Sequence, residues 1–121
     1  LARIVAHATH SQAPEWFTTA PVTAIRNVLD KAGWTVADVD LFEINEAFSC
    51  VAMAPMKDLD IPHDKVNVHG GAVALGHPIG ASGARLVVTL INALRARGGK
   101  KGVASLCIGG GEATAIAIEL P

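Results

Sequence analysis

Short apolar runs alternate along this chain with segments whose apolar residues recur at helical spacing. Five runs predict strands, at residues 1–7, 39–44, 66–68, 103–107 and 114–120. The segments between them predict three helices, at residues 21–32, 47–59 and 83–97. The order βαβαβαββ is typical of an α/β fold with a five-stranded, mostly parallel sheet and helices on both faces. The last strand should be antiparallel to the strand before it, because the connection between them is very short.

Turn and cap residues mark the ends of the predicted helices. Gly33 suits the left-handed residue after the first helix, and Gly98 should end the third helix in the same way. Ser82 or a neighbour is expected to cap the third helix. Pro55 should kink or split the second helix, because proline lacks the amide proton that a helix interior uses. Residues 9–20 are polar and predict a loop.

The third predicted helix is apolar around nearly its whole circumference. Its apolar side chains are Leu86, Val87, Val88, Leu90, Ile91, Ala93 and Leu94. A helix at a protein surface usually shows an apolar stripe instead. Since a single sheet can cover only one side of this helix, we expect a second layer, formed by residues outside this chain, to cover the other.

Composition narrows the classes of function. The 121 residues predict one domain, residues 1–121, and the net charge of −1 favours neither nucleic acid nor an anionic membrane as a partner. No apolar run reaches the ~18 residues of a membrane helix. Two cysteines do not form a disulfide framework, so both are expected to be reduced, as in the cytoplasm or an organelle matrix. The chain begins inside a predicted strand without a signal peptide, which suggests a domain of a longer protein.

Polar and glycine-rich signals follow the predicted strands. Asn45 follows the second strand, Gly76-His77-Pro78 follows the third, and Cys107 ends the fourth. The carboxyl ends of parallel strands share one edge of a sheet, so an amide, an imidazole and a thiol should meet in one crevice.

Each of these residues also has a purely structural interpretation. Asn45 could cap the helix that follows it, and His77 could be a half-buried, hydrogen-bonded histidine. Cys107 could be a small apolar residue at a strand end, and the glycines 109–111 could form only a hairpin turn. Cys50, inside the second helix, is interpreted as a packing residue.

Two common kinds of site are excluded by the residues present. The remaining histidines lack the spacing of a metal site, and no zinc motif occurs. Gly71 and Gly76 have the spacing of a phosphate-binding loop, but His77 stands where that loop needs lysine, and Pro78 where it needs serine or threonine. Nucleotide binding is therefore rejected.

Three segments, in this order and at these spacings, resemble the thiolases (acetyl-CoA acetyltransferases). They are Asn45-Glu46-Ala47-Phe48, the glycine-rich stretch from Gly70 to Gly83, and Cys107-Ile108-Gly109-Gly110-Gly111. The resemblance covers most of the chain and implies the C-terminal half of the thiolase fold. Thiolases pair two similar halves so that a central helix from each lies between two sheets, which agrees with the apolar third helix.

The resemblance implies a catalytic role for four residues. His77 would activate a nucleophilic cysteine and would form an oxyanion hole with a water held by Asn45. Cys107 would act as the acid and base, and the backbone N–H of Gly109 would form half of a second oxyanion hole. These groups suit a Claisen condensation, which needs a thiolate, a base and donors for the enolate oxygen.

Other matching residues are implied to bind substrate. Ala47 and Phe48 would lie along the pantetheine arm of coenzyme A, and Gly76 would also contact substrate. Glu46 would support Asn45 and His77. The resemblance implies no cofactor apart from the coenzyme A thioester, which is the substrate.

The thiolase nucleophile itself belongs to the N-terminal half, and nothing in these residues matches it. We therefore expect an enzyme part that makes or cleaves 3-oxoacyl-CoA, as in fatty acid metabolism and β-oxidation, inactive alone and forming a dimer or tetramer when full-length. Residues 11–19 and His69 depart from the thiolase pattern, which leaves the acyl preference open. The alternatives are a non-catalytic scaffold or dimerisation domain and a sterol-carrier-type thiolase-like protein.

Overall fold

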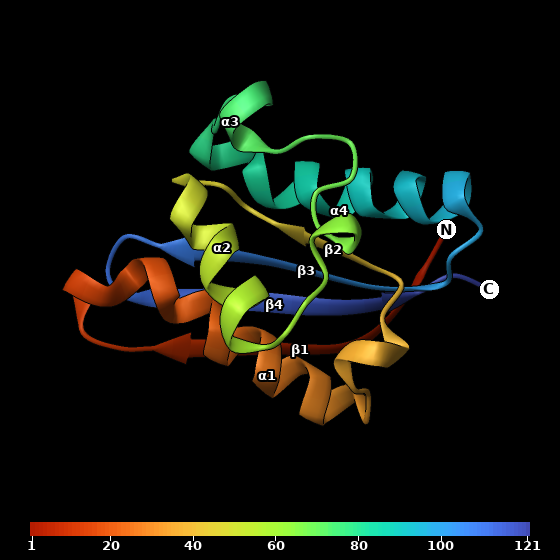
Figure 1. Cartoon of the computed structure of the whole chain (residues 1–121), viewed down its shortest axis with the longest axis horizontal. Coiled ribbons are helices and arrows are strands. Elements are labelled where there is room, and N and C mark those ends of the chain that lie inside the picture. Colours follow the sequence, from red (N-terminus) through yellow and green to blue (C-terminus); the bar gives the residue numbers. More distant parts are fainter.

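A computed structural model describes all 121 residues as a four-stranded sheet with helices on both faces (Figure 1). The strands are β1 (Arg3–Ser11), β2 (Leu41–Ile44), β3 (Lys101–Ile108) and β4 (Glu112–Glu119). The helices are α1 (Ala20–Ala32), α2 (Ser49–Asp58), α3 (Ala72–Leu75) and α4 (Ile79–Arg97), with 3₁₀ turns at Pro14–Thr19, Val36–Asp38 and His63–Lys65. None of the helices combines the length and the apolar character that crossing a bilayer requires.

The sheet is mixed, so the expectation that most of its strands pair in parallel was wrong. The strand order is β1-β4-β3-β2, in which only β2 and β3 pair in parallel. β4 is antiparallel to β3, as expected from the short connection, and it is also antiparallel to β1. Because β4 lies between β1 and β3, the reversal of this one strand makes two of the three pairings antiparallel.

The predicted fifth strand, at residues 66–68, does not form. Only a single parallel bridge, between Val66 and Phe42, occurs there. Asn67 has a left-handed backbone with φ of 49°. Its side-chain amide takes the place of a neighbouring strand and makes two hydrogen bonds of 2.8 Å, with the N–H and the carbonyl oxygen of Ile44. A residue in this conformation interrupts a strand, so the pairing stops after one residue.

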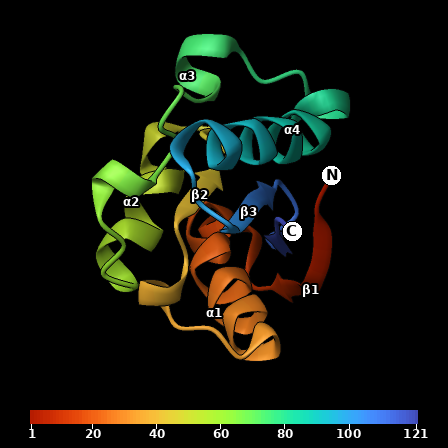
Figure 2. The same cartoon turned by 90° about the vertical axis from the view of Figure 1, so that its right-hand side faces the viewer.

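Two apolar cores lie on the two faces of the sheet, which Figure 2 shows with α1 and α2 on one side and α4 on the other. One core packs α1 and α2 against side chains such as Phe42, Ile44 and Val103. The other packs α4 against β2, β3 and β4, with Leu86, Leu90 and Leu94 fully buried. The expectation of helices on both faces is confirmed.

Several predicted boundaries needed correction. β1 continues to Ser11, and part of the predicted loop forms the first 3₁₀ turn. α4 begins at Ile79, four residues before the predicted start, so Pro78 is its N-cap and Ser82 lies inside its first turns. Pro55 lies within α2 without dividing it, and the one-turn helix α3 had not been predicted.

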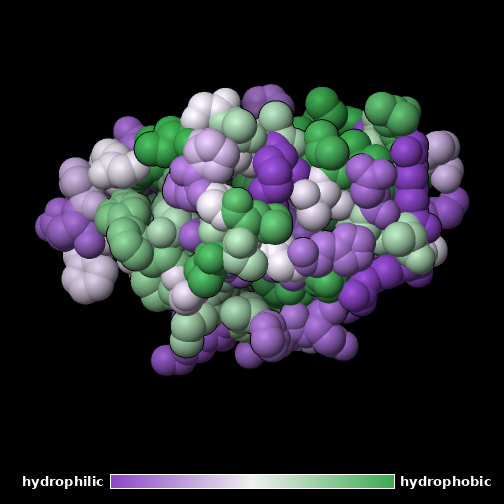
Figure 3. Space-filling view, turned by 90° about the horizontal axis from the view of Figure 1, so that it is seen from above, coloured by the Kyte–Doolittle hydropathy of each residue, from purple (hydrophilic) through white to green (hydrophobic).

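The surface beside α4 keeps large apolar side chains in contact with solvent (Figure 3). Ile79 is 85% exposed and Val88 is 59% exposed. An open groove of about 200 Å³ runs between α4 and the sheet, with Val87, Leu106 and Ile116 in its lining. These exposed side chains give the expected second layer an apolar surface to pack against.

The turn between β3 and β4 depends on one glycine. Gly111 has φ of 104°, and a Cβ there would overlap the carbonyl oxygen of Gln12, which packs against the turn.

We expect Gly111→Ala to lower the free energy of unfolding by at least about 2 kcal/mol, measured by urea denaturation of the 121-residue chain. Gly109→Ala is the control in the same turn, because a Cβ there meets nothing within 4 Å; its effect should stay within about 0.5 kcal/mol. Equal effects of the two substitutions would contradict this account of the turn.

Candidate active site

Asn45 is held at the edge of the sheet by the last hydrogen bond of the β2–β3 pairing. It follows β2 directly, and its backbone N–H donates to the carbonyl oxygen of Ser105 over 2.9 Å. Its side chain is fully buried. The position of the carboxamide is therefore tied to the sheet and not to a mobile loop.

His77 lies in the turn that leads into α4. Gly76 before it has φ of 92°, a backbone conformation that glycine adopts without strain, and Pro78 after it caps the helix. The Nδ1 of His77 lies 2.5 Å from the Ser82 hydroxyl, which donates to the carbonyl oxygen of Pro78 over 3.1 Å. Since that hydroxyl proton is used, the hydroxyl accepts from Nδ1–H. The neutral ring thus carries its proton on Nδ1 and a lone pair on Nε2.

The structure brings Asn45 and His77 into contact. The Nδ2 of Asn45 lies 3.3 Å from the Nε2 of His77, although 31 residues separate them in the sequence. An amide nitrogen can only donate, so the contact agrees with a lone pair on Nε2. The other amide atom, Oδ1 of Asn45, is buried and has no hydrogen-bond partner in the structure.

Cys107 lies at the same edge of the sheet but does not hydrogen-bond to Asn45 or His77. It comes two residues after Ser105 on β3 and is buried. Leu106 packs in the core on the α4 side, so the alternation of strand side chains directs Cys107 to the other face. Burial raises the pKa of the Cys107 thiol, and the nearby Cys50 adds a smaller effect in the same direction. At neutral pH this thiol keeps its proton.

The predicted substrate-binding residues lie at or near the surface. Phe48 is 60% exposed and makes an edge contact with Phe17, with 6.3 Å between the ring centroids. Ala47 beside it is half-buried. Gly76 and Gly109 are exposed, and a Cβ at either would meet nothing within 4 Å, so a ligand could approach the backbone at both.

The interpretation of Cys50 as a packing residue was wrong, because Cys50 is exposed on α2 while the next two residues face the core. No group of three or more histidine, cysteine, aspartate or glutamate side chains is arranged to hold a metal ion. Both cysteines are free.

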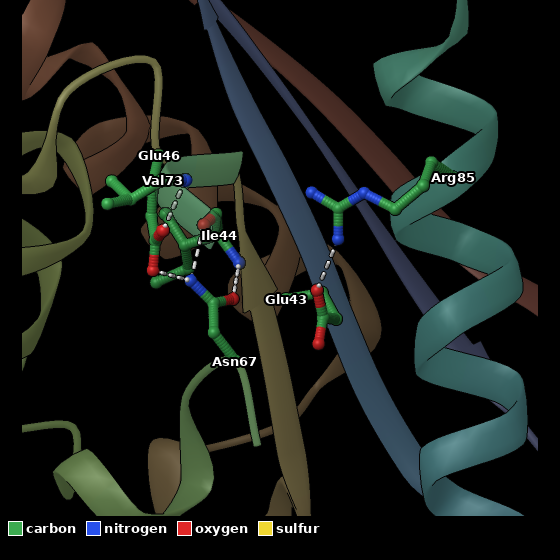
Figure 4. Close-up of polar contacts among 6 residues, drawn as sticks. All are labelled: Glu43, Ile44, Glu46, Asn67, Val73 and Arg85. Atoms are coloured by element: carbon green, nitrogen blue, oxygen red, sulfur yellow. Dashed lines mark hydrogen bonds and ion pairs between the residues drawn. The ribbon is translucent and has the colours of Figure 1, made fainter. Parts of the chain in front are cut away.

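An ion pair joins β2 to α4 that the sequence analysis missed (Figure 4). The Glu43 carboxylate, 1% exposed, accepts a hydrogen bond of 3.1 Å from Arg85. One oxygen of Glu43 and one nitrogen of Arg85 remain buried without partners. Burial raises the pKa of Glu43 to about 7, and Arg85 opposes the rise without cancelling it. Glu43 is the one charged residue of β2, and no sequence spacing connects it with Arg85, 42 residues later in α4.

Comparison with known proteins shows the family of this chain. Residues 1–120 match the protein family described as "Thiolase, C-terminal domain". The chain belongs to the thiolase family. The whole of this thiolase domain aligns, at 54% identity, with 31% of an acetyl-CoA acetyltransferase from Chromobacterium violaceum.

Two further relatives agree. A cytosolic acetyl-CoA acetyltransferase from Mus musculus is 50% identical over 98% of this thiolase domain and 30% of its own length. The solved structure of human mitochondrial 3-ketoacyl-CoA thiolase in complex with CoA superposes with a TM-score of 0.95 and 46% identity, covering 99% of this domain and 30% of that chain. This thiolase domain therefore spans about a third of the length of the relatives it matches.

The raised pKa of Glu43 predicts how the stability of the domain depends on pH. Between its ordinary value of 4.5 and the folded value of about 7, the folded state holds a proton that the unfolded state has lost. The free energy of unfolding should therefore fall as the pH rises through this window, by about 2 to 3 kcal/mol between pH 5 and pH 8. Urea denaturation should show that Glu43→Gln removes this fall.

The matched control is Glu15→Gln, which changes an exposed glutamate and should keep the pH dependence of the parent chain. The assignment of this pH dependence to Glu43 would be contradicted if the free energy of unfolding changed with pH in the same way in Glu43→Gln and in the parent from pH 5 to pH 8.

Proposed function

We propose that this domain contributes Asn45, His77 and Cys107 to the active site of a thiolase that makes or cleaves 3-oxoacyl-CoA. The observation that carries the proposal is the contact between the Asn45 amide and the His77 imidazole at the strand edge where Cys107 also lies. The nucleophilic cysteine would come from a segment outside these 121 residues. Coenzyme A thioesters would be the substrates.

His77 would take the proton of the nucleophilic cysteine. A thiol of pKa about 8.5 is mostly protonated at neutral pH, so it needs a neighbouring base. The Nε2 lone pair of His77 would be such a base once the thiol replaces the 3.3 Å contact with the Asn45 N–H, and the Ser82 hydroxyl would keep the ring in the required tautomer. After accepting the proton, Nε2–H becomes a donor that can stabilise a developing oxyanion.

Asn45 would complete that oxyanion hole. Its Oδ1 is buried without a partner, and a water bound there would satisfy the atom and present a donor toward the substrate. Removing one donor from an oxyanion hole typically lowers the rate by about 10²- to 10³-fold. The backbone N–H of Gly109 would serve a second hole, since its surroundings are open.

Cys107 would transfer the proton at the carbon that reacts. In the cleavage direction the nucleophilic thiolate would bond to the 3-oxo carbon, the bond from that carbon to the α carbon would break, and its electron pair would leave on the α carbon as an enolate. The Cys107 thiol, which burial keeps protonated, would give its proton to that carbon. The resulting thiolate would then take the proton of the incoming CoA thiol. In the condensation direction Cys107 must first lose its proton.

The remaining assignments follow the same proposal. Ala47 and Phe48 would line the pantetheine arm, with Gly76 also contacting substrate. An N-terminal thiolase half would cover α4 and its apolar groove, and the complete enzyme would form a dimer or tetramer. The free cysteines favour the cytoplasm or an organelle matrix, and the relatives described above include cytosolic and mitochondrial enzymes.

The test is a chimera in which this chain replaces the matching part of the Chromobacterium violaceum enzyme. The chimera should catalyse thiolysis of acetoacetyl-CoA, and His77→Ala should lower kcat by at least about 10²-fold, because the base is lost. His63→Ala, at an exposed histidine, is the control and should leave kcat unchanged.

Three results would contradict the proposal. A folded chimera without turnover, or one whose turnover survives His77→Ala, would favour a non-catalytic scaffold or dimerisation domain. Turnover by the 121-residue chain alone would also contradict it, since the proposed nucleophile lies outside this chain. A preference of the chimera for longer or sterol-derived acyl groups would favour a sterol-carrier-type thiolase.

A further inference from the structure

We propose that Glu46 and Asn67 are positioning residues, which together hold Asn45 at the right place against His77. The inference rests on the proposed function, because it assigns these residues a part in the same reaction. Neither side chain is placed to contact substrate here. Both act through the backbone on either side of Asn45 and through the segment that carries His77.

Asn67 fixes the residue before Asn45. Its Oδ1 accepts from the Ile44 N–H over 2.8 Å, and its Nδ2 donates to the Ile44 carbonyl oxygen over 2.8 Å. These bonds replace those of a neighbouring strand on the outer edge of β2. The left-handed backbone of Asn67 aims the amide at this edge, and asparagine tolerates that conformation better than most residues.

Glu46 fixes the residue after Asn45 and connects it to the glycine-rich stretch. One carboxylate oxygen accepts from Asn67 Nδ2 over 3.0 Å, and the other accepts from the backbone N–H of Val73 over 3.0 Å. Val73 lies in α3, four residues before His77. Figure 4 shows the carboxylate between these two donors. A single side chain thus ties the β2 end to the segment leading to His77.

Gly71 shows that the position of this carboxylate is built into the fold. Gly71 is buried, and a Cβ added to it would overlap all three carboxyl atoms of Glu46. Its backbone is extended, so the glycine is needed here for space and not for an unusual φ. The glycine-rich stretch therefore includes one glycine whose role is to admit Glu46.

Asn45 needs this external support because its own side chain has little. The amide makes one contact, the 3.3 Å approach to His77, and its Oδ1 has no partner. Beyond the backbone bond of Asn45 to Ser105, the amide therefore depends on the side-chain bonds that hold residues 44 and 46. A misplacement of about 1 Å at a reacting group can lower a rate by roughly 10²-fold.

The test is Glu46→Gln in the chimera, because glutamine keeps the shape but has only one acceptor oxygen for two donors. We expect kcat for thiolysis to fall by about 10- to 100-fold, with KM changed less than about 3-fold. Glu15→Gln, at an exposed glutamate, is the matched control and should change neither constant.

A double-mutant cycle separates positioning from a general loss of structure. If Glu46 acts through Asn45, then Glu46→Gln should lower kcat by less than about 2-fold in a chimera that already carries Asn45→Ala. Additive effects on kcat would overturn the proposal. So would a parent-like kcat for Glu46→Gln alone.

Further measurements distinguish a positioning role of Glu46 from a loss of folding, and a failure of this inference from a failure of the proposed function. If Glu46→Gln fails to fold by circular dichroism, Asn67→Asp is measured instead, since its carboxylate would repel Glu46 and should give the same loss of kcat. Loss of the fold in both variants would overturn the positioning role. Activity that survives His77→Ala would refute the proposed function, whereas loss in His77→Ala with full activity in Glu46→Gln would refute only this inference.

Discussion

The parallel pairing of β2 with β3 is the constraint on which the candidate site depends. It sets the carboxyl ends of two strands side by side, so that Asn45 and Cys107 reach the same edge although 62 positions separate them. The hydrogen bond from Asn45 to Ser105 extends the pairing by one residue beyond β2. α4 packs across these two strands, and the turn that leads into it carries His77. The site is thus an outcome of sheet register and helix packing.

Buried and half-buried polar side chains hold the candidate site together. Asn67 substitutes for a missing strand on β2, Ser82 orients the His77 ring, and Glu46 joins the two segments that carry Asn45 and His77. Such groups are costly to bury unless they are bonded, and each of these has partners. The exceptions are the Asn45 oxygen, part of the Glu43–Arg85 pair, and one oxygen of Glu112 at the start of β4. Hydrogen-bonded side chains thus surround a few buried polar atoms that have no hydrogen-bond partner within the chain.

Much of the fold was predictable because apolar periodicity depends on local side chains. The pattern located all four strands and the three longer helices, and the whole-circumference apolar character of α4 agrees with its exposed Val88 and Ile79. Residues 66–68 could not be recognised as irregular, because the cause is a side-chain amide that bonds to a strand more than twenty residues away. The strand pairing was missed for a similar reason: connection lengths do not reveal that β4 inserts between β1 and β3. The contact of Asn45 with His77 was expected from strand ends, but the strand at residues 66–68 that was to place His77 does not form, and the turn into α4 places it instead.

Transfer of a labelled acetyl group from acetyl-CoA to the chimera tests the central claim most directly, because it separates the two proposed proton transfers. The parent chimera should become labelled on a cysteine outside the 121 residues. His77→Ala should become labelled far more slowly, whereas Cys107→Ala should still become labelled yet fail to condense the acetyl group, since a CoA thiolate can leave without a proton. Label on Cys107 itself, or labelling of His77→Ala at the parent rate, would contradict the account.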